Sequence, residues 1–315
     1  MVKKLVKGTT SEKHEDTAPG QTGGDSTAAY IPDPALGKKY RHRKIAGVGD
    51  FDLLDYAMRT RQNVLLMGDT GAGKTMVGAA YASERAIPYY SLPCDVSIDP
   101  SALFGRMYPT DTEGKFEWVD GPVTELVRSG GVLNISEINF MPPKIAASLY
   151  PLLDGRRYVP LLGHKGEVVH AHDDLLIIAD MNPNYRGTVE LNAAFKNRFP
   201  LKVVWNYDDG VEKSLVKGAT IRSCAKQLRD GGEVRTPIST NLLIEFETMV
   251  QDDSLTYEFA VLNFLNAFTG NEREAVKNVL DVRRNEIERD YRPASLPSDD
   301  EDIVIDEDDF VYIGE

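Results

Sequence analysis

The octapeptide GDTGAGKT at residues 68–75 constrains the fold of this chain more than any other feature. It fits the pattern G-x-x-x-x-G-K-[ST], follows the apolar stretch NVLLM, and precedes MVGAAYASERA, which has a helical pattern. Glycines at these positions let successive backbone N–H groups converge on one point, and the following helix adds its positive N-terminal end. A strand, a phosphate-binding loop and a helix in this order predict an α/β nucleotide-binding domain.

The loop also predicts which side chains meet the ligand. Lys74 is placed to reach the β- and γ-phosphates, and the Thr75 hydroxyl is placed to ligate Mg²⁺. We therefore expect ATP and Mg²⁺ as cofactors. The predicted nucleotide-binding residues are Gly68, Asp69, Thr70, Gly71, Ala72, Gly73, Lys74, Thr75 and Met76.

Short apolar runs predict a five-stranded, mostly parallel sheet covered by helices on both faces. Several runs lack polar alternation, as expected for strands that are buried on both sides. The runs are NVLLM at 63–67, IPYYSL at 87–92, GVLNI at 131–135, DLLIIA at 174–179 and LKVVW at 201–205. Turn residues within 104–120 and 156–173 predict two β-hairpin insertions.

The apolar spacing changes to three and four residues after about position 210, which predicts helices, with Ser239 ahead of one of them and Glu274 and Lys277 on another. We expect residues 39–206 to form the α/β domain and residues 207–292 a helical lid. Residues 1–38 lack apolar periodicity and residues 293–315 are strongly acidic, so both are expected to be disordered.

Composition and charge narrow the class of protein. The 315 residues are 42% hydrophobic and include two cysteines far apart, and no apolar run approaches a membrane span or a secretory leader. We expect a cytoplasmic protein without a membrane partner. The net charge is −13, and the last 17 residues alone carry nine acids and no base. That balance argues against nucleic acid as the main partner. The basic run KKYRHRK at 38–44 reads either as a solvated lead-in or as a phosphate-binding patch.

A second and a third motif follow the loop. GPVTELVRSGGVLNISEINFMPP contains an apolar strand with Glu137 at its tip, and IIADMNPNYRGTVELNAAFKNRF contains Asn182 after a strand and Arg198 near its end. With GDTGAGKT, these segments resemble the AAA+ ATPases of the MoxR type and their dynein-related relatives, over roughly residues 45–250. The resemblance implies a P-loop AAA+ αβα core with a helical lid.

The resemblance also implies roles. Glu137 corresponds to the general base or water-orienting carboxylate, Asn182 to the sensor-1 residue, and Arg198 to the arginine finger that enters the neighbouring subunit's site, with Lys74 on the phosphates. Phosphoryl transfer needs such groups to position water and neutralise charge. An oligomeric ring, such as a hexamer, and a protein client or a partner with a von Willebrand A domain are implied as well. The two hairpins would face the pore or the partner, or merely decorate the surface.

The chain departs from the family pattern at the metal site. Ser136 stands where the Mg²⁺-supporting Asp usually stands, and Asp180 stands where relatives usually carry Thr. If the two strands are neighbours, their tips lie close together, so Asp180 is a candidate for the missing acid. The candidate metal ligands are therefore Thr75, Ser136 and Asp180. In the alternative, Thr75 and the phosphates hold Mg²⁺ alone.

Two further points stay open at the level of sequence. The lid position where relatives carry the sensor-2 arginine has Asn241, with Arg235 the nearest candidate. The leading interpretation is an ATPase chaperone that remodels a protein partner by slow or partner-stimulated hydrolysis. The alternatives are an ATP-binding scaffold with little or no hydrolysis, as Ser136 would favour, and a DNA-directed AAA+ motor.

Overall fold

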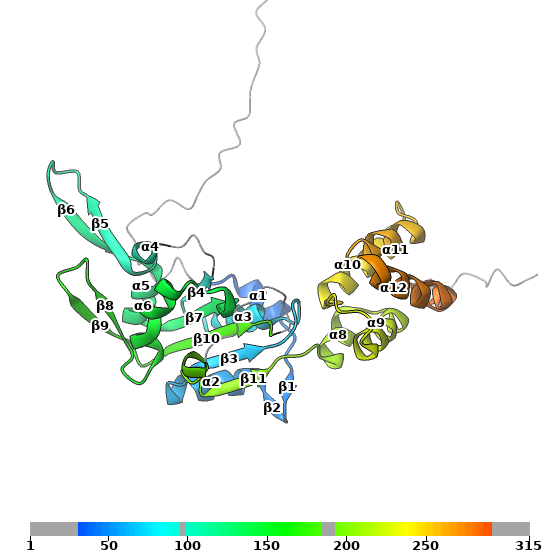
Figure 1. The fold of residues 1–315 in the computed structure, drawn as a ribbon, viewed down its shortest axis with the longest axis horizontal. Helices are drawn as coiled ribbons and strands as arrows, with labels where there is room; N and C mark the ends of the chain where they lie inside the picture. The colour runs from blue at the N-terminus through cyan, green and yellow to red at the C-terminus, as the bar shows by residue number, and fades with distance from the viewer. Residues whose placement is uncertain (1–30, 95–98, 184–192, 292–315) are drawn as a thin grey trace, which may run out of the picture.

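In a computed structural model of the chain, residues 31–94, 99–183 and 193–291 are described. The centre of the α/β domain is a parallel five-stranded sheet of order β11-β3-β10-β7-β4, which confirms the predicted α/β class (Figure 1). The strands are β3 (Val64–Met67), β4 (Tyr89–Pro93), β7 (Gly131–Ser136), β10 (Leu175–Met181) and β11 (Leu201–Val204). They coincide with the five apolar runs of the sequence.

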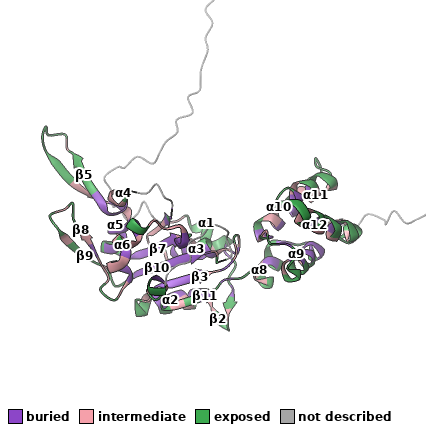
Figure 2. Cartoon of the chain, viewed as in Figure 1, coloured by how far each residue is buried: buried purple, intermediate pink, exposed green. Residues whose placement is uncertain are grey.

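Helices cover both faces of the sheet, so the domain has three layers (Figure 1). α2 (Asp50–Thr60) and α3 (Lys74–Arg85) share one apolar core with the sheet. α4 (Pro100–Phe104), α5 (Pro122–Ser129), α6 (Pro143–Leu153) and α7 (Ala193–Lys196) contribute to the core on the other face. Every residue of β10, the central strand, is buried, which explains its unbroken apolar run up to Asp180 (Figure 2).

Both predicted hairpins are present and lie at the same end of the domain (Figure 1). β5 (Gly105–Pro109) and β6 (Phe116–Asp120) lie between α4 and α5, and β8 (Tyr158–Leu161) and β9 (Glu167–His170) lie between α6 and β10. The rings of Trp118 and His164 stack with centroids 5.0 Å apart and planes 9° apart. This ring pair holds the two hairpins together.

The helices after β11 have an apolar core of their own. They are α8 (Asp209–Leu215), α9 (Ala219–Gly231), α10 (Thr240–Val250), α11 (Tyr257–Leu265), α12 (Gly270–Val282) and α13 (Arg284–Tyr291). Ser239 caps α10 as the sequence suggests, since its hydroxyl accepts a hydrogen bond from Leu242 N at 3.1 Å. None of the helices in the described ranges combines the length and apolar character needed to cross a bilayer.

The N-terminal segment corrects one expectation. Disorder was expected up to residue 38, but α1 (Pro34–Lys39) is a helix tied to α3, because Gly37 N donates to Ser83 Oγ at 3.1 Å. In the basic run at 38–44, Tyr40 and Arg43 pack into the domain, and the other five residues are exposed, as expected for a solvated lead-in. A two-stranded ribbon, β1 (Lys44–Ile45) and β2 (Val48–Gly49), then leads into α2. Residues 1–30 and the acidic tail lie outside the described residues.

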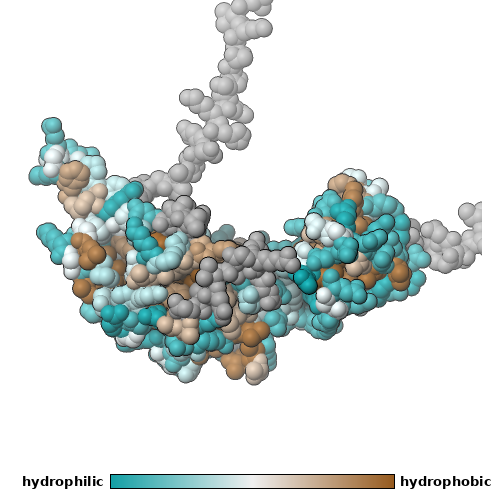
Figure 3. Space-filling view, viewed as in Figure 1, coloured by the Kyte–Doolittle hydropathy of each residue, from teal (hydrophilic) through white to brown (hydrophobic). Residues whose placement is uncertain are grey.

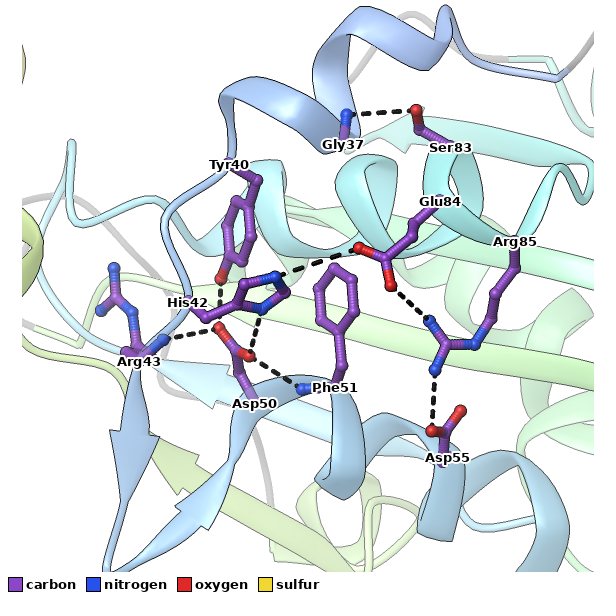
Figure 4. A network of polar contacts seen from close by, with 10 residues as sticks. All are labelled: Gly37, Tyr40, His42, Arg43, Asp50, Phe51, Asp55, Ser83, Glu84 and Arg85. Carbon is purple, nitrogen blue, oxygen red and sulfur yellow. Dashed lines mark hydrogen bonds and ion pairs between the residues drawn. The ribbon is translucent and has the colours of Figure 1, made fainter.

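Asp50, which is 1% exposed, organises this segment (Figure 4). Its Oδ2 accepts hydrogen bonds from the Tyr40 hydroxyl at 2.7 Å and from Arg43 N at 3.0 Å. Its Oδ1 accepts from Phe51 N at 2.9 Å and lies 3.1 Å from His42 Nδ1. A buried carboxylate needs such compensation, so this cluster fixes the backbone at Arg43.

Replacing Asp50 with Asn should destabilise the fold, because an amide N–H₂ would face donors that the carboxylate now accepts. We expect a loss of about 2–3 kcal/mol in the free energy of unfolding, measured by urea denaturation. Asp52→Asn, on the exposed side of α2, is the matched control and should cost about 0.5 kcal/mol. Equal effects of the two substitutions would contradict this role of Asp50.

Candidate functional site

The glycine-rich loop joins β3 to α3 and requires glycine at several positions. Gly71 and Gly73 have φ of 74° and 85°, in the left-handed region that favours glycine. A Cβ on Gly68 would lie 2.0 Å from the carbonyl oxygen of Trp205, which no side chain can tolerate. The loop therefore folds as the motif predicts, with α3 beginning at Lys74 and Met76 exposed on its first turn.

Lys74 is buried in the concave side of the loop. Its Nζ donates to the carbonyl oxygens of Gly68 at 2.8 Å and Asp69 at 2.7 Å. Burial lowers the pKa of Lys74, and the charges of Asp180, Asp69 and Glu137 oppose that shift. The ammonium group thus sits among backbone carbonyls and acids, where a phosphate chain in the loop would be within its reach.

The parallel pairing of β7 and β10 brings their tips together, as the sequence predicts. Asp180, 2% exposed, joins three parts of the site. Its Oδ2 accepts a hydrogen bond from the Thr75 hydroxyl at 3.3 Å, and its Oδ1 accepts one from Glu137 N at 3.3 Å. Burial raises the pKa of Asp180, while the Glu137 N–H, Lys74, Asn134 and Thr75 lower it. The loop and both strand tips therefore converge on one carboxylate.

Glu137 is the first residue after β7 and lies exposed at its tip. Its φ and ψ are 54° and 48°, a left-handed conformation that is rare for a residue with a side chain. The hydrogen bond from its N–H to Asp180 helps to compensate that conformation. The backbone bend turns the chain away from the strand direction into the short 3₁₀ helix η2 (Ile138–Phe140).

The Ser136 hydroxyl contacts side chains of β7 and of the neighbouring strand β4. Its Oγ accepts a hydrogen bond from Asn134 Nδ2 at 2.8 Å and lies 3.1 Å from Ser91 Oγ on β4. Of the three candidate metal ligands, Thr75 and Asp180 thus contact one another, and Ser136 contacts its neighbours on β7 and β4.

Asn182 follows β10 and donates from Nδ2 to Thr70 Oγ1 at 3.1 Å. The predicted sensor therefore touches the phosphate loop. Asn182 also lines a cavity of about 700 Å³ between the loop and the helical region. Other residues that line it are Asp69, Tyr207, Arg229, Arg235 and Glu272.

Arg198 lies at the opposite end of the sheet from the loop. Its carbonyl accepts a hydrogen bond from Asn63 Nδ2 at 2.8 Å, and Asn63 immediately precedes β3, whereas Gly68 follows it. The five residue steps from Asn63 to Gly68 span roughly 16 Å, so Arg198 cannot reach the phosphate loop of its own chain. Its guanidinium lies 4.2 Å from the Tyr150 ring centroid and donates to the Ala194 carbonyl, and it has no carboxylate within 4 Å in the described ranges.

Three residues that sequence reasoning missed hold the loop from behind. The carbonyl of Ala72 accepts hydrogen bonds from Arg43 Nη2 at 2.9 Å and Trp205 Nε1 at 3.0 Å. The Arg43 guanidinium lies 4.4 Å from the Trp205 ring centroid, and the Tyr207 hydroxyl donates to the carbonyl of Thr70 at 2.7 Å. The basic run at 38–44 contained Arg43, but only the fold shows that it reaches the loop.

Tyr207 also connects the loop to the helices that follow. The guanidinium of Arg229 lies 3.8 Å from its ring centroid and pairs with both oxygens of Glu212, at 3.0 and 2.7 Å. Arg229 is therefore neutralised by a buried acid. Arg235 has its backbone N–H bonded to Glu272 at 3.0 Å, which fixes its loop beside the cavity.

The donors present suit a nucleoside triphosphate with Mg²⁺. Phosphate would be bound by a lysine, by backbone N–H groups of the loop and by the N-terminus of a helix. Mg²⁺ prefers oxygen ligands, and the Thr75 hydroxyl and an Asp180 carboxylate oxygen, 3.3 Å apart, are of that kind. Across the described ranges, no group of three or more His, Cys, Asp or Glu side chains is placed to hold a metal.

Comparisons with known proteins agree with this geometry. The family model described as an AAA domain of the dynein-related subfamily matches residues 63–199. An uncharacterised protein of Staphylococcus aureus strain USA300 is 34% identical over 170 residues, which are 53% of this chain and 64% of that protein. A protein of strain MRSA252 matches with the same figures. The chain thus spans less than two thirds of the length of these curated relatives.

Two solved structures are similar at low identity. A protein of Cytophaga hutchinsonii described as a candidate ATPase has a TM-score of 0.42 and 20% identity, over 80% of this chain and 69% of that one. NtrX of Brucella abortus in complex with ADP has a TM-score of 0.39 and 17% identity, over 79% of this chain and 55% of that one.

Replacing Arg43 with Met should weaken nucleotide binding, because the Ala72 carbonyl would lose one of two donors and the loop would lose its brace. We expect about a tenfold weaker affinity for a fluorescent ATP analogue, equivalent to about 1.4 kcal/mol. Arg41→Met, which removes an exposed charge from the same run, should leave the affinity within about twofold of the parent chain. Equal affinities for the two variants would contradict the bracing role.

Proposed function

We propose that residues 63–199, which match the model of the dynein-related AAA domain, form such a domain, and that the chain hydrolyses ATP in a ring of subunits in the manner of MoxR-type ATPases. The observation that carries the proposal is the convergence of Lys74, Thr75 and Glu137 around Asp180. Those groups are what a phosphoryl-transfer site needs.

Each residue of the site has a separate role in phosphoryl transfer. Backbone N–H groups of the loop and the Lys74 ammonium bind the β- and γ-phosphates, and Mg²⁺ supplies further positive charge when bound. The Glu137 carboxylate orients the attacking water and accepts its proton. The Asn182 amide, held at the Thr70 hydroxyl, fixes the water and the terminal phosphate on one side. Arg235, on a lid loop beside the same cavity, is our candidate for the lid's contact to the terminal phosphate.

The position of Arg198 supports assembly into a ring. An arginine at the far end of β3 from the loop cannot stabilise the transition state of its own subunit, but it can do so for a neighbour. Its guanidinium contacts the Tyr150 ring and the Ala194 carbonyl, and it acts on Asp154 without an ion pair within 4 Å in the described ranges. A head-to-tail contact between subunits closes into a ring when the rotation permits.

The two hairpins support a protein partner. Apolar side chains are exposed along both of them, and Figure 3 shows them at the end of the domain that the hairpins occupy. The residues are Met107, Tyr108, Phe116, Leu162 and Val168. Clustered apolar exposure of this kind is typical of interaction sites. We propose a protein client or a von Willebrand A domain partner for this surface.

Mixing two inactive variants tests the proposal. Arg198→Ala and Glu137→Gln should each lower ATP turnover at least a hundredfold. In an equal mixture, about a quarter of the sites should combine an intact Glu137 with a neighbour's intact Arg198, so about a quarter of the parent rate should return. The measurement is phosphate release at fixed total protein, with each variant alone as its control.

The absence of any recovery in mixtures, beside an active parent chain, would contradict the shared site. An Arg198→Ala variant with the parent rate would contradict it as well. Lys196→Ala, two residues away on α7, is the matched control for the loss of a positive charge.

A further inference from the structure

We infer that Asp180, on the strand after which the sensor asparagine lies, supplies the carboxylate of the Mg²⁺ site in place of an acid on β7. This inference rests on the proposed function, since it concerns the metal that accompanies the nucleotide. Asp180 is on β10 and Thr75 is on α3. These elements are far apart in the sequence, and the fold brings the two side chains into contact.

The distance between the two oxygens fits a shared metal. Adjacent ligands of an octahedral Mg²⁺, each about 2.1 Å from the ion, lie about 3.0 Å from one another. Thr75 Oγ1 and Asp180 Oδ2 are 3.3 Å apart. The Thr75 hydroxyl and the Asp180 carboxylate would therefore be the residues that hold Mg²⁺, and the carboxylate would supply the negative charge that offsets the ion.

The charge of Asp180 forms no ion pair within 4 Å in the described part of the chain, although Lys74 acts on it from farther away. The carboxylate is 2% exposed, and no Lys, Arg or His nitrogen there lies within 4 Å of its oxygens. A buried ionised carboxylate is costly without a cation or several hydrogen bonds, and here the donors are Thr75, Asn134 and the Glu137 N–H. A divalent cation on the Thr75 side would offset that cost.

The structure also explains why β7 does not need to supply the acid. Ser136 is hydrogen-bonded to Asn134 and lies within hydrogen-bond distance of Ser91 on β4. These polar groups at the tip of β7 therefore contact one another and are uncharged. A second acid at this position would lie beside Asp180, and two carboxylates at one site repel each other. The serine at 136 and the aspartate at 180 are therefore complementary substitutions.

Asp180 has a second task that an acid on β7 could not perform in the same way. Its Oδ1 accepts the N–H of Glu137, whose backbone is left-handed, while its Oδ2 faces Thr75. One carboxylate thus positions the residue that orients water and holds the residue that ligates the metal. Loss of Asp180 should disturb metal binding and the placement of Glu137 together.

The test measures metal and nucleotide separately on the full chain. Mn²⁺, a paramagnetic substitute for Mg²⁺, is titrated in the presence of saturating ADP and followed by electron paramagnetic resonance. ADP affinity without metal is measured in EDTA with a fluorescent ADP analogue. The variants are Asp180→Thr, Ser136→Ala, and the exchange Ser136→Asp combined with Asp180→Thr, each checked for folding by circular dichroism.

We expect Asp180→Thr to weaken Mn²⁺ binding at least tenfold while metal-free ADP affinity changes less than threefold. Ser136→Ala should bind Mn²⁺ as the parent chain does, and the exchange should return the affinity to within about threefold of it. Parent-like Mn²⁺ affinity in Asp180→Thr, or a loss in Ser136→Ala as large as that in Asp180→Thr, would overturn the inference. Failure of the parent chain to bind ADP at all would instead overturn the proposed function.

Discussion

The site depends on how closely the end of β3 approaches the chain that leaves β11. Trp205 N donates to Met67 O at 2.7 Å, and Gly68 N donates to Met181 O at 3.1 Å, so the first residues of the loop are fixed by backbone bonds to both neighbouring strands. Only glycine fits at 68, because the Trp205 carbonyl occupies the place of a side chain. The loop is therefore shaped before any ligand arrives, and this preorganisation avoids an ordering cost on binding.

The same contacts connect the nucleotide to the rest of the molecule. Behind the loop, Arg43 reaches Ala72 from the N-terminal segment, and Tyr207 reaches Thr70 from the linker to the helical region. Tyr207 in turn packs under Arg229, whose partner Glu212 is on α8. If phosphate binding displaced the carbonyls of Ala72 and Thr70, their partners in the N-terminal segment and in the linker would be displaced as well. The linker therefore joins the phosphate loop to the helical region through the contacts of Tyr207.

The sequence predicted the parts of the fold that local patterns encode. The five strands were visible as apolar runs, since burial on both faces removes alternation, and the glycine spacing predicted the loop. The proximity of Ser136 and Asp180 followed from two strand tips in one parallel sheet. The role of Arg43 was missed because its partner is 29 residues away in sequence, and α1 was missed because a six-residue helix held by Ser83 has no periodicity of its own.

The most direct test of the account is ATP turnover measured across a range of protein concentrations, for the parent chain and Glu137→Gln, with ATP binding followed in parallel. The account predicts that turnover per subunit rises with concentration as sites assemble between subunits, and that Glu137→Gln abolishes turnover while ATP still binds. Tight ATP binding by the parent chain with no turnover at any concentration would contradict it, and the chain would then be a nucleotide-binding scaffold.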